Sequence, residues 1–362
     1  MRRLAFSLLG LALLSAPSAE VRAQRSEYPL ILVPTAKGPF TFPPGYQTPW
    51  DRIEIMVTEK MSPNLYVLHG SQGLDAAHPD ASGGRAMVLF GPDGVLLVDT
   101  GTAAMAEKVW AAVQSISKKP MRYIINTTEQ PEHAGGNAVI APRGSIVPLR
   151  GRNYAAGPMG SIEYNKASVI SYLSVLHRMS APTGQKAPYP TAAWPDNTYS
   201  TPIKRFYFNH EAVVVTHMPG NTDGNSVVMF RNSDVMSVGD LLDLSGYPLI
   251  DLKAGGSVQS LVTTLNRLIE MAVPEAHAAG GTMIVAGHGR IADHAEVAYY
   301  RDMVTIVRDR IQDGIRKKLT LEQIKAARPT REYDPRYGRT TGFTTDMFIE
   351  AVYRSLVAAG TN

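Results

Sequence analysis

The chain of 362 residues contains no cysteine. This absence excludes disulfide bonds, a thiolate nucleophile and every metal site that depends on sulfur ligands. Any metal in this protein must therefore be held by histidine, aspartate or glutamate. An exported protein of this length can fold on its hydrophobic core alone, so the lack of disulfides does not argue against export.

An excess of charge of one sign is also missing. The 36 basic side chains are nearly balanced by 32 acidic ones, and the resulting charge of +4 is spread along the chain. No basic stripe with interleaved aromatic residues occurs, so the sequence gives no support for a nucleic-acid partner. A small-molecule substrate is the expected partner, and nothing in the sequence indicates the oligomeric state.

The N-terminus has the pattern of a targeting segment. Arg2 and Arg3 precede an apolar run at 4–14, and Val21-Arg22-Ala23 fits a small-residue cleavage site. The run is shorter than the roughly 20 residues that cross a bilayer, so an uncleaved anchor is the weaker alternative. Paired arginines also occur in twin-arginine signals. We predict a signal peptide at 1–23 and a mature protein without a membrane span, located in the periplasm or secreted.

Alternating strand and helix patterns predict a layered α/β domain. An extended arm rich in proline and aromatic residues (24–54) comes first, and a helical C-terminal extension (311–362) follows the main domain (55–310). Strands are expected at 51–57, 65–69, 86–90, 95–98 and 122–126, with a hairpin turn at "GPDG" (91–94) and a helix at 104–116.

The second half of the chain continues this pattern around one unusual segment. Residues 150–205 are rich in Pro, Gly, Tyr and Ser, and we interpret them either as a substrate-facing insertion or as an inert surface excursion. The other predicted elements are a strand continuing the sheet at 139–149, a helix-like piece near 165–178, strands at 212–217, 226–230, 235–242 and 282–289, a helix at 258–272, a capping box from Thr320 to Gln323 and a packing stripe of Met347, Phe348, Ala351 and Val352.

Four candidate metal ligands follow the predicted strands. Glu132 and His133, then Asp240, then His288 each lie at or just after a strand end, with glycines close by in sequence. Strand ends that meet at one edge of a sheet are where layered α/β folds build their sites. Glycine allows the backbone to come close where side chains must converge. We therefore expect these four side chains to meet.

Five motifs, correct in order and spacing, resemble the metallo-β-lactamase superfamily over roughly residues 55–310. They are "LLVDTG" (96–101), "NTTEQPEHAGGN" (126–137), "HMPGNTDGNS" (217–226), "SVGDLL" (237–242) and "AGHG" (286–289). The resemblance implies a four-layer αββα sandwich that binds metal at one edge of its two sheets.

The resemblance also implies that half of the metal centre is altered. The family's His-x-His-x-Asp-His loop corresponds here to residues 128–133, and its next histidine corresponds to Asn221. Thr128, Gln130 and Asn221 thus replace the three histidines of the first metal, and they become candidate substrate-contacting or vestigial positions. The counterparts of the second metal's ligands are Glu132, His133, Asp240 and His288.

The four counterparts of the second metal's ligands form a chemically reasonable site for one metal. Two imidazoles and two carboxylates suit zinc best, and iron or manganese is also compatible. Glu132 carries its carboxylate about 1.5 Å further out than the family's aspartate, so the backbone or the metal must shift. One metal lowers the pKa of a bound water and polarises a carbonyl or phosphoryl oxygen. We expect Asp240 and Glu132 to take part in catalysis as well as in binding.

Three further carboxylates have predicted supporting roles. Purely structural roles for the candidate ligands also stay open. Asp99 is expected to support the ligands from behind, and Glu129 or Asp223 is a candidate general base. The histidines could instead make structural hydrogen bonds, and Asp240 could cap a turn. His217 is a weak alternative ligand, since a strand separates it from Asn221 by about 13 Å.

Two functions agree with these residues. The first is an exported hydrolase with one catalytic metal, acting on an ester, amide, lactone or phosphoester. The second is a catalytically inactive relative whose pocket binds a small molecule or a protein partner. Retained liganding chemistry at Glu132, His133, Asp240 and His288 favours the hydrolase.

Overall fold

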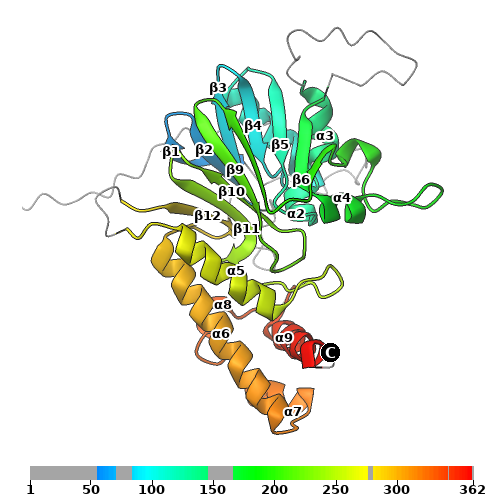
Figure 1. Ribbon diagram of the computed structural model, residues 1–362, viewed down its shortest axis with the longest axis vertical. Helices are drawn as coiled ribbons and strands as arrows, with labels where there is room; N and C mark the ends of the chain where they lie inside the picture. Colours follow the sequence, from blue (N-terminus) through cyan, green and yellow to red (C-terminus); the bar gives the residue numbers. More distant parts are fainter. Residues whose placement is uncertain (1–54, 71–83, 146–165, 276–279, 341, 361–362) are drawn as a thin grey trace, which may run out of the picture.

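The structure, a computed structural model, describes residues 55–70, 84–145, 166–275, 280–340 and 342–360. Two sheets pack face to face and helices cover both outer faces (Figure 1). The expected signal peptide and extended arm lie outside the described residues, and the proposed domain boundaries stay predictions. Within the described part of the chain, no helix is both long enough and apolar enough to cross a membrane.

The first sheet is built by the N-terminal half of the described chain. Its strands lie in the order β1 to β7, antiparallel from β1 to β4 and parallel from β4 to β7. The expected hairpin is confirmed, because β3 and β4 pair from Met87–Val98 to Gly91–Gly94 around the predicted turn. The strands are β1 (Ile55–Ser62), β2 (Leu65–Gly70), β3 (Ala86–Gly91), β4 (Gly94–Val98), β5 (Met121–Ile125), β6 (Ser168–Tyr172) and β7 (Asn197–Tyr199).

The second sheet has the order β13-β12-β11-β10-β9-β8. Neighbouring strands run antiparallel except for β11 and β12, which are parallel. The strands are β8 (Ile203–Phe208), β9 (Glu211–His217), β10 (Ser226–Phe230), β11 (Val235–Asp243), β12 (Met283–His288) and β13 (Ile291–Ala292). The parallel pair matters for the site, because both of its strands carry candidate ligands toward the same edge.

Alternating side chains explain the layers. In β4, Val95 and Leu97 pack with α1 (Ala106–Ile116), whereas Leu96 and Val98 pack against the second sheet. Successive residues of a strand point to opposite faces, so a strand that is apolar throughout needs cover on both sides. The predicted αββα sandwich is therefore confirmed, with one core between the sheets and one under each helical layer.

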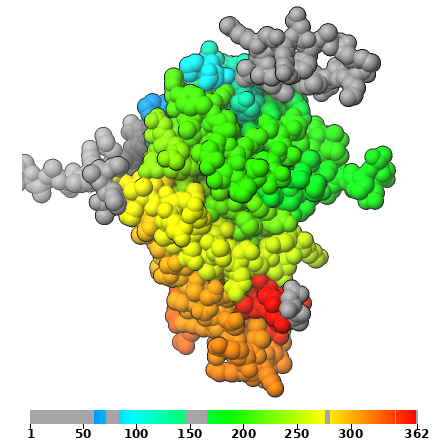
Figure 2. Space-filling model, in the orientation of Figure 1, coloured from blue at the N-terminus to red at the C-terminus, as the bar shows by residue number. Residues whose placement is uncertain are grey.

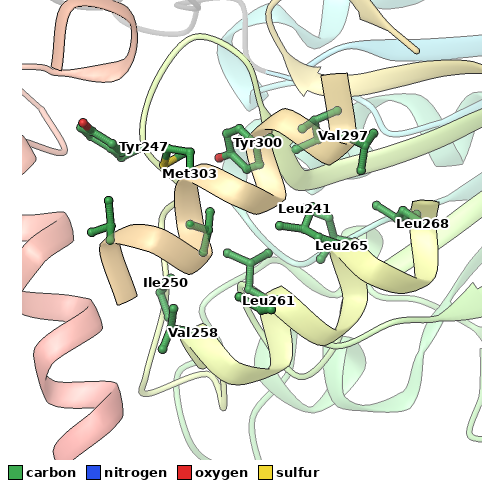
Figure 3. Packing of buried hydrophobic residues seen from close by; sticks show 14 of the residues in the cluster. Leu241, Tyr247, Ile250, Val258, Leu261, Leu265, Leu268, Val297, Tyr300 and Met303 are labelled. Atoms are coloured by element: carbon green, nitrogen blue, oxygen red, sulfur yellow. The ribbon is translucent and has the colours of Figure 1, made fainter. Parts of the chain in front are cut away.

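Helices α5 (Val258–Met271) and α6 (His294–Arg316) cover the outer face of the second sheet. Figure 3 shows Leu261, Leu265 and Leu268 of α5 packed with Val297 and Tyr300 of α6. The spacing of three and four residues places the leucines on one face of the helix. Ser257 caps α5, its hydroxyl accepting from the Ser260 amide at 3.0 Å.

The C-terminal helices extend the molecule beyond the sandwich (Figure 2). Asp293 begins α6 by accepting from the Glu296 amide, and the capping box of Thr320 and Gln323 at the start of α7 is confirmed. Of the expected stripe on the last helix, Phe348 and Val352 are buried, whereas Met347 is 49% exposed. These helices are α7 (Leu321–Ala326), α8 (Asp334–Tyr337) and α9 (Thr345–Gly360).

The strand expected at 139–149 is wrong for its described part. Residues 137–143 form a short helix and a 3-10 turn, named α3 (Asn137–Ile140) and η3 (Ala141–Arg143). Ile140 and Ala141 are buried beneath the first sheet with α1, so the apolar run serves helical packing instead of strand pairing. Pro142 also has no amide hydrogen to donate to a sheet.

The interpretation of 150–205 as an insertion is wrong for its described part. From residue 166 onward it supplies β6 and β7 to the first sheet and β8 to the second, and the helix-like piece is a strand followed by α4 (Leu173–Met179). Two further 3-10 turns are η2 (Ala103–Met105) and η4 (Thr191–Ala193). Strands this short carry a weak pattern amid Pro and Gly, so their place in the sheets depends on tertiary pairing.

Candidate metal centre

His133, Asp240 and His288 come together at the edge of the two sheets. Each offers one ligand atom, and these three atoms lie within 4.8 Å of one another. His133 comes from α2 (Pro131–Ala134), Asp240 from β11 and His288 from the end of β12. Asp240 and His288 are neighbours because β11 and β12 are paired in parallel, with a register shift between Gly239 and Asp243.

His133 is held between two carboxylates. Its Nδ1 lies 2.7 Å from Asp99 Oδ2 and its Nε2 lies 2.7 Å from Asp240 Oδ1. His288 Nε2 lies 3.3 Å from the same Asp240 oxygen. His133 and Asp99 are fully buried and Asp240 is only 8% exposed. Of the two ring nitrogens of His133, only Nε2 therefore points toward the other candidate ligands.

The local backbone positions Asp99 for this role. It follows β4 with a φ of 60°, a left-handed conformation that aspartate tolerates better than most residues. Its carboxylate accepts from the amide and the hydroxyl of Thr127, at 2.8 and 2.7 Å, as well as from His133. This places the predicted supporting carboxylate directly behind a candidate ligand, and a carboxylate in that position fixes the orientation of a metal-binding imidazole.

Close approach of the backbone shapes the centre at two glycines. A Cβ on Gly84 would lie 2.5 Å from Cε1 of His133, and a Cβ on Gly287 would lie 2.7 Å from Oδ1 of Asp240. Any larger residue at either position would displace the side chain that it touches. Gly84 was not found by sequence reasoning, because a glycine before a strand is not by itself a signal.

The charges of these groups are strongly coupled. Burial alone would lower the pKa of His133, but Asp240 and Asp99 outweigh burial and raise its pKa to about 10. Burial would raise the pKa of Asp240, but His133 and His288 hold it well below its usual range. Without a metal, His133 is thus an imidazolium that donates to both carboxylates. A cation bound by Nε2 would replace that proton.

The donor set fits a divalent metal. Ligand atoms of tetrahedral zinc lie about 3.3 Å apart when each bond is about 2.0–2.1 Å. The separation of His288 Nε2 and Asp240 Oδ1, 3.3 Å, already matches this value. The hydrogen bond between His133 and Asp240 must lengthen by several tenths of an ångström. Two imidazoles and one carboxylate leave a fourth position open, which is the arrangement of catalytic zinc sites.

Glu132 does not join this group. His133 is buried, whereas its neighbour Glu132 is exposed, and the carboxylate of Glu132 is not part of the cluster. α2 turns the side chain of His133 into the protein and leaves that of Glu132 at the surface. The expectation that Glu132 acts as a ligand and in catalysis is not supported by this geometry.

The three altered positions lie elsewhere in the same region. The Thr128 hydroxyl donates to Glu129 at 3.3 Å, and Gln130 precedes α2 and is half-buried. The Asn221 side chain donates to the Leu249 carbonyl at 2.7 Å, and its buried Oδ1 has no hydrogen-bond partner among the described residues. His217 contacts the Asp223 carbonyl and stacks on Tyr172, and it does not belong to the metal group.

Sequence reasoning also missed Arg178 in α4. Its guanidinium binds both oxygens of the Glu129 carboxylate and contacts Asp223 Oδ1 at 2.7 Å. Burial opposes the charge of Arg178, but the two carboxylates raise its pKa further. Glu129 and Asp223, the predicted candidate bases, are both ion-paired and do not lie free beside the cluster. No local motif marks Arg178, because its partners are far apart in sequence.

Comparison with known proteins agrees with the fold and the motifs. The family model described as "Metallo-beta-lactamase superfamily" matches residues 79–288, more than half of the chain. The chain belongs to the metallo-beta-lactamase superfamily. Members of this superfamily are hydrolases, and the prediction of an enzyme agrees with this membership. The predicted resemblance is confirmed.

Solved structures share the fold at low sequence identity. The stereoselective inverting sec-alkylsulfatase Pisa1 from Pseudomonas sp. is 13% identical with a TM-score of 0.54, covering 83% of this chain and 50% of that one. This chain thus spans about half the length of the sulfatase. A metallo-beta-lactamase from Pontibacter korlensis is 16% identical with a TM-score of 0.49, covering 70% and 99%. The comparison with curated proteins found no match.

Proposed function

We propose that this protein is a hydrolase that uses one divalent metal, held by His133, Asp240 and His288. The observation that carries the proposal is the convergence of these three ligand atoms within 4.8 Å on a fold whose family members are hydrolases. Zinc is the best candidate, and iron or manganese also fits two imidazoles and a carboxylate. The substrate class stays an ester, amide, lactone or phosphoester.

The side chains around the proposed metal have different roles in this mechanism. Asp99 accepts from Nδ1 of His133, which directs Nε2 toward the cation. Asp240 supplies negative charge that offsets the charge of the cation in a buried setting. The bound metal would supply an activated water and polarise the substrate oxygen. Since Glu129 and Asp223 are engaged by Arg178, neither carboxylate is free to act as a general base.

A single-metal centre agrees with the Arg178 contacts. Glu129 is next to Thr128, and Asp223 is two residues from Asn221, so the guanidinium ties together the two loops that carry altered positions. A fixed cation there neutralises carboxylates that could otherwise help to hold a second metal. This arrangement supports one metal per chain.

Metal analysis and hydrolysis assays test the proposal together. We expect about one equivalent of zinc, iron or manganese in the purified protein and its loss in His133→Ala and His288→Ala. His177→Ala, an exposed histidine on α4, is the matched control and should keep the metal. The substrate panel contains ester, lactone, β-lactam and phosphoester compounds, and a secondary alkyl sulfate because one structural neighbour is named a sec-alkylsulfatase.

One observation favours the inactive alternative. Both ring nitrogens of His133 already have hydrogen-bond partners, so the cluster is satisfied as a structural network without any cation. A protein that stays folded, takes up no metal on reconstitution and is inert toward the whole panel would support the inactive alternative and contradict hydrolysis.

We also propose that the protein is exported. The basic, apolar and small-residue pattern of residues 1–23 supports a cleaved signal peptide. Mass spectrometry of the protein recovered from the periplasm or medium should find a new N-terminus at Gln24. An intact Met1 on protein recovered from the cytoplasm would refute export.

A further inference from the structure

Thr127 connects the two sheets beside the candidate metal centre. It is buried and follows β5 of the first sheet. Its carbonyl accepts from the amide of Ser226, the first residue of β10 in the second sheet, at 2.8 Å. Its side chain lies against β11, because a Cβ on Gly239 would be 2.5 Å from Thr127 Oγ1. Gly239 directly precedes the candidate ligand Asp240.

The Thr127 side chain and backbone together hold the carboxylate of Asp99. The Thr127 amide donates to Asp99 Oδ1 at 2.8 Å, and the Thr127 hydroxyl donates to Asp99 Oδ2 at 2.7 Å. A hydroxyl has a single hydrogen to donate, and here it is used for this contact. One residue therefore fixes both oxygens of the carboxylate and opposes its rotation.

The oxygen that the Thr127 hydroxyl holds is the same one that orients His133. Asp99 Oδ2 lies 2.7 Å from His133 Nδ1, and Thr127 Oγ1 itself is 3.5 Å from that nitrogen. The opposite ring nitrogen, Nε2, points to Asp240. Any shift of Asp99 Oδ2 would turn the imidazole and move Nε2 away from the other ligand atoms.

Asp99 has few other supports. Among the residues that the structure describes, its carboxylate accepts from Thr127 and His133 alone. Without the Thr127 hydroxyl, the position of Oδ2 would depend on the imidazole that it is supposed to orient. The close contact with Gly239 also leaves no room for a side chain larger than threonine.

We propose that Thr127 is a positioning residue of the metal centre, whose hydroxyl fixes the Asp99 oxygen that directs His133 Nε2 toward the cation. Thr127 touches neither the cation nor a substrate and acts through Asp99. This inference rests on the proposed function, because it names a side chain on which the affinity of that metal site depends.

A zinc competition titration of matched variants tests this role. Thr127→Val keeps the shape of the side chain and removes the donor, so we expect zinc affinity to fall about tenfold, the lower end of the loss seen when the partner of a metal-binding histidine is removed. Thr127→Ser keeps the hydroxyl and should restore the natural affinity. Thr127→Ala removes the hydroxyl without adding volume at Gly239 and should show the same loss as Thr127→Val.

Thr264→Val is the matched control, because it removes another buried threonine hydroxyl, one that donates to the Pro219 carbonyl. It should bind zinc as the natural protein does. Natural affinity in Thr127→Val and Thr127→Ala, or an equal loss in Thr264→Val, would overturn the positioning role.

NMR of the histidine ring nitrogens in the zinc-free protein tests the same role without a metal. The Nδ1 proton signal of His133, identified by its absence in His133→Gln, should be alike in the natural protein and Thr127→Ser and should shift or broaden in Thr127→Val. An unchanged signal in Thr127→Val would contradict the inference. A natural protein that binds no zinc would overturn the proposed function, and this signal would then decide by itself whether Thr127 orients the ring.

Discussion

Two groups of polar side chains include residues of the segment 126–134, and each group neutralises its carboxylates with a different kind of cation. At the metal centre, His133 lies between Asp99 and Asp240, and a cation can replace its Nε2 proton. On the other side, Arg178 binds Glu129 and Asp223 with a charge that cannot be removed. In both places the carboxylates are paired with a cation, although Asp223 is partly exposed, and only the imidazole can exchange its proton for a metal.

The two groups therefore differ in whether their cation can be exchanged. A titratable imidazole leaves the cation exchangeable, whereas a guanidinium is charged at every physiological pH. The comparison predicts that changes at the metal centre affect both metal content and stability. Changes at the Arg178 clamp, defined by Arg178, Glu129 and Asp223, should affect stability and leave the metal in place.

The largest effect is expected from His133→Ala. The variant leaves Asp99 and Asp240 as buried carboxylates without their cationic partner, so the free energy of unfolding should fall by about 3–5 kcal/mol in EDTA. Urea denaturation measures this change, and His177→Ala should stay within about 0.5 kcal/mol of the natural protein. A comparably small change in the stability of His133→Ala would show that Asp99 and Asp240 do not depend on His133 as their cationic partner.

Gly84→Ala should come next. The added methyl group would lie 2.5 Å from His133, so the ring must shift, with a loss of about 1–3 kcal/mol in stability and weaker metal binding. Thermal unfolding and a zinc competition titration measure the two effects. Gly360→Ala, where nothing lies within 4 Å, is the control for the substitution itself. Unchanged zinc affinity in Gly84→Ala would mean that the ring position does not limit binding.

Arg178→Met tests the Arg178 clamp separately from the metal centre. Glu129 and Asp223 lose their partner, but Asp223 is 48% exposed and solvent screens part of the loss, so about 1–2 kcal/mol is expected. Arg178→Lys should recover part of this, since it keeps the charge and loses the fork. Metal content should remain at one equivalent. If the His133 metal is lost together with the clamp, the two groups are not independent.

The smallest effect is expected from Asn221→Ala. It removes one hydrogen bond to the Leu249 carbonyl, which should cost about 1 kcal/mol and leave metal content unchanged. Denaturation and metal analysis on the same preparation check both. A drop in metal content would show that Asn221 acts on the centre, in spite of its place outside the cluster.

Much of the candidate site could be predicted from the sequence. His133, Asp240 and His288 follow strands whose apolar patterns are clear, so their placement at one sheet edge could be inferred. Glu132 could not be placed, because the sequence alone does not fix which of two neighbouring side chains on α2 points into the protein. Arg178 was hidden for a different reason: its carboxylate partners are 49 and 45 residues away, and only folding brings them together.

The sequence by itself determined most strands and helices outside residues 139–208, the capping box of Thr320 and Gln323 and the motifs of a metallo-beta-lactamase fold, because periodicity and turn chemistry are local properties. Tertiary structure decided that the apolar residues at 139–141 pack as a helix, that residues 166–205 join the sheets, and which carboxylate contacts which cation. Pairing, burial and charge neutralisation depend on groups far apart in the chain, and their energies are defined only once the backbone has brought those groups into contact.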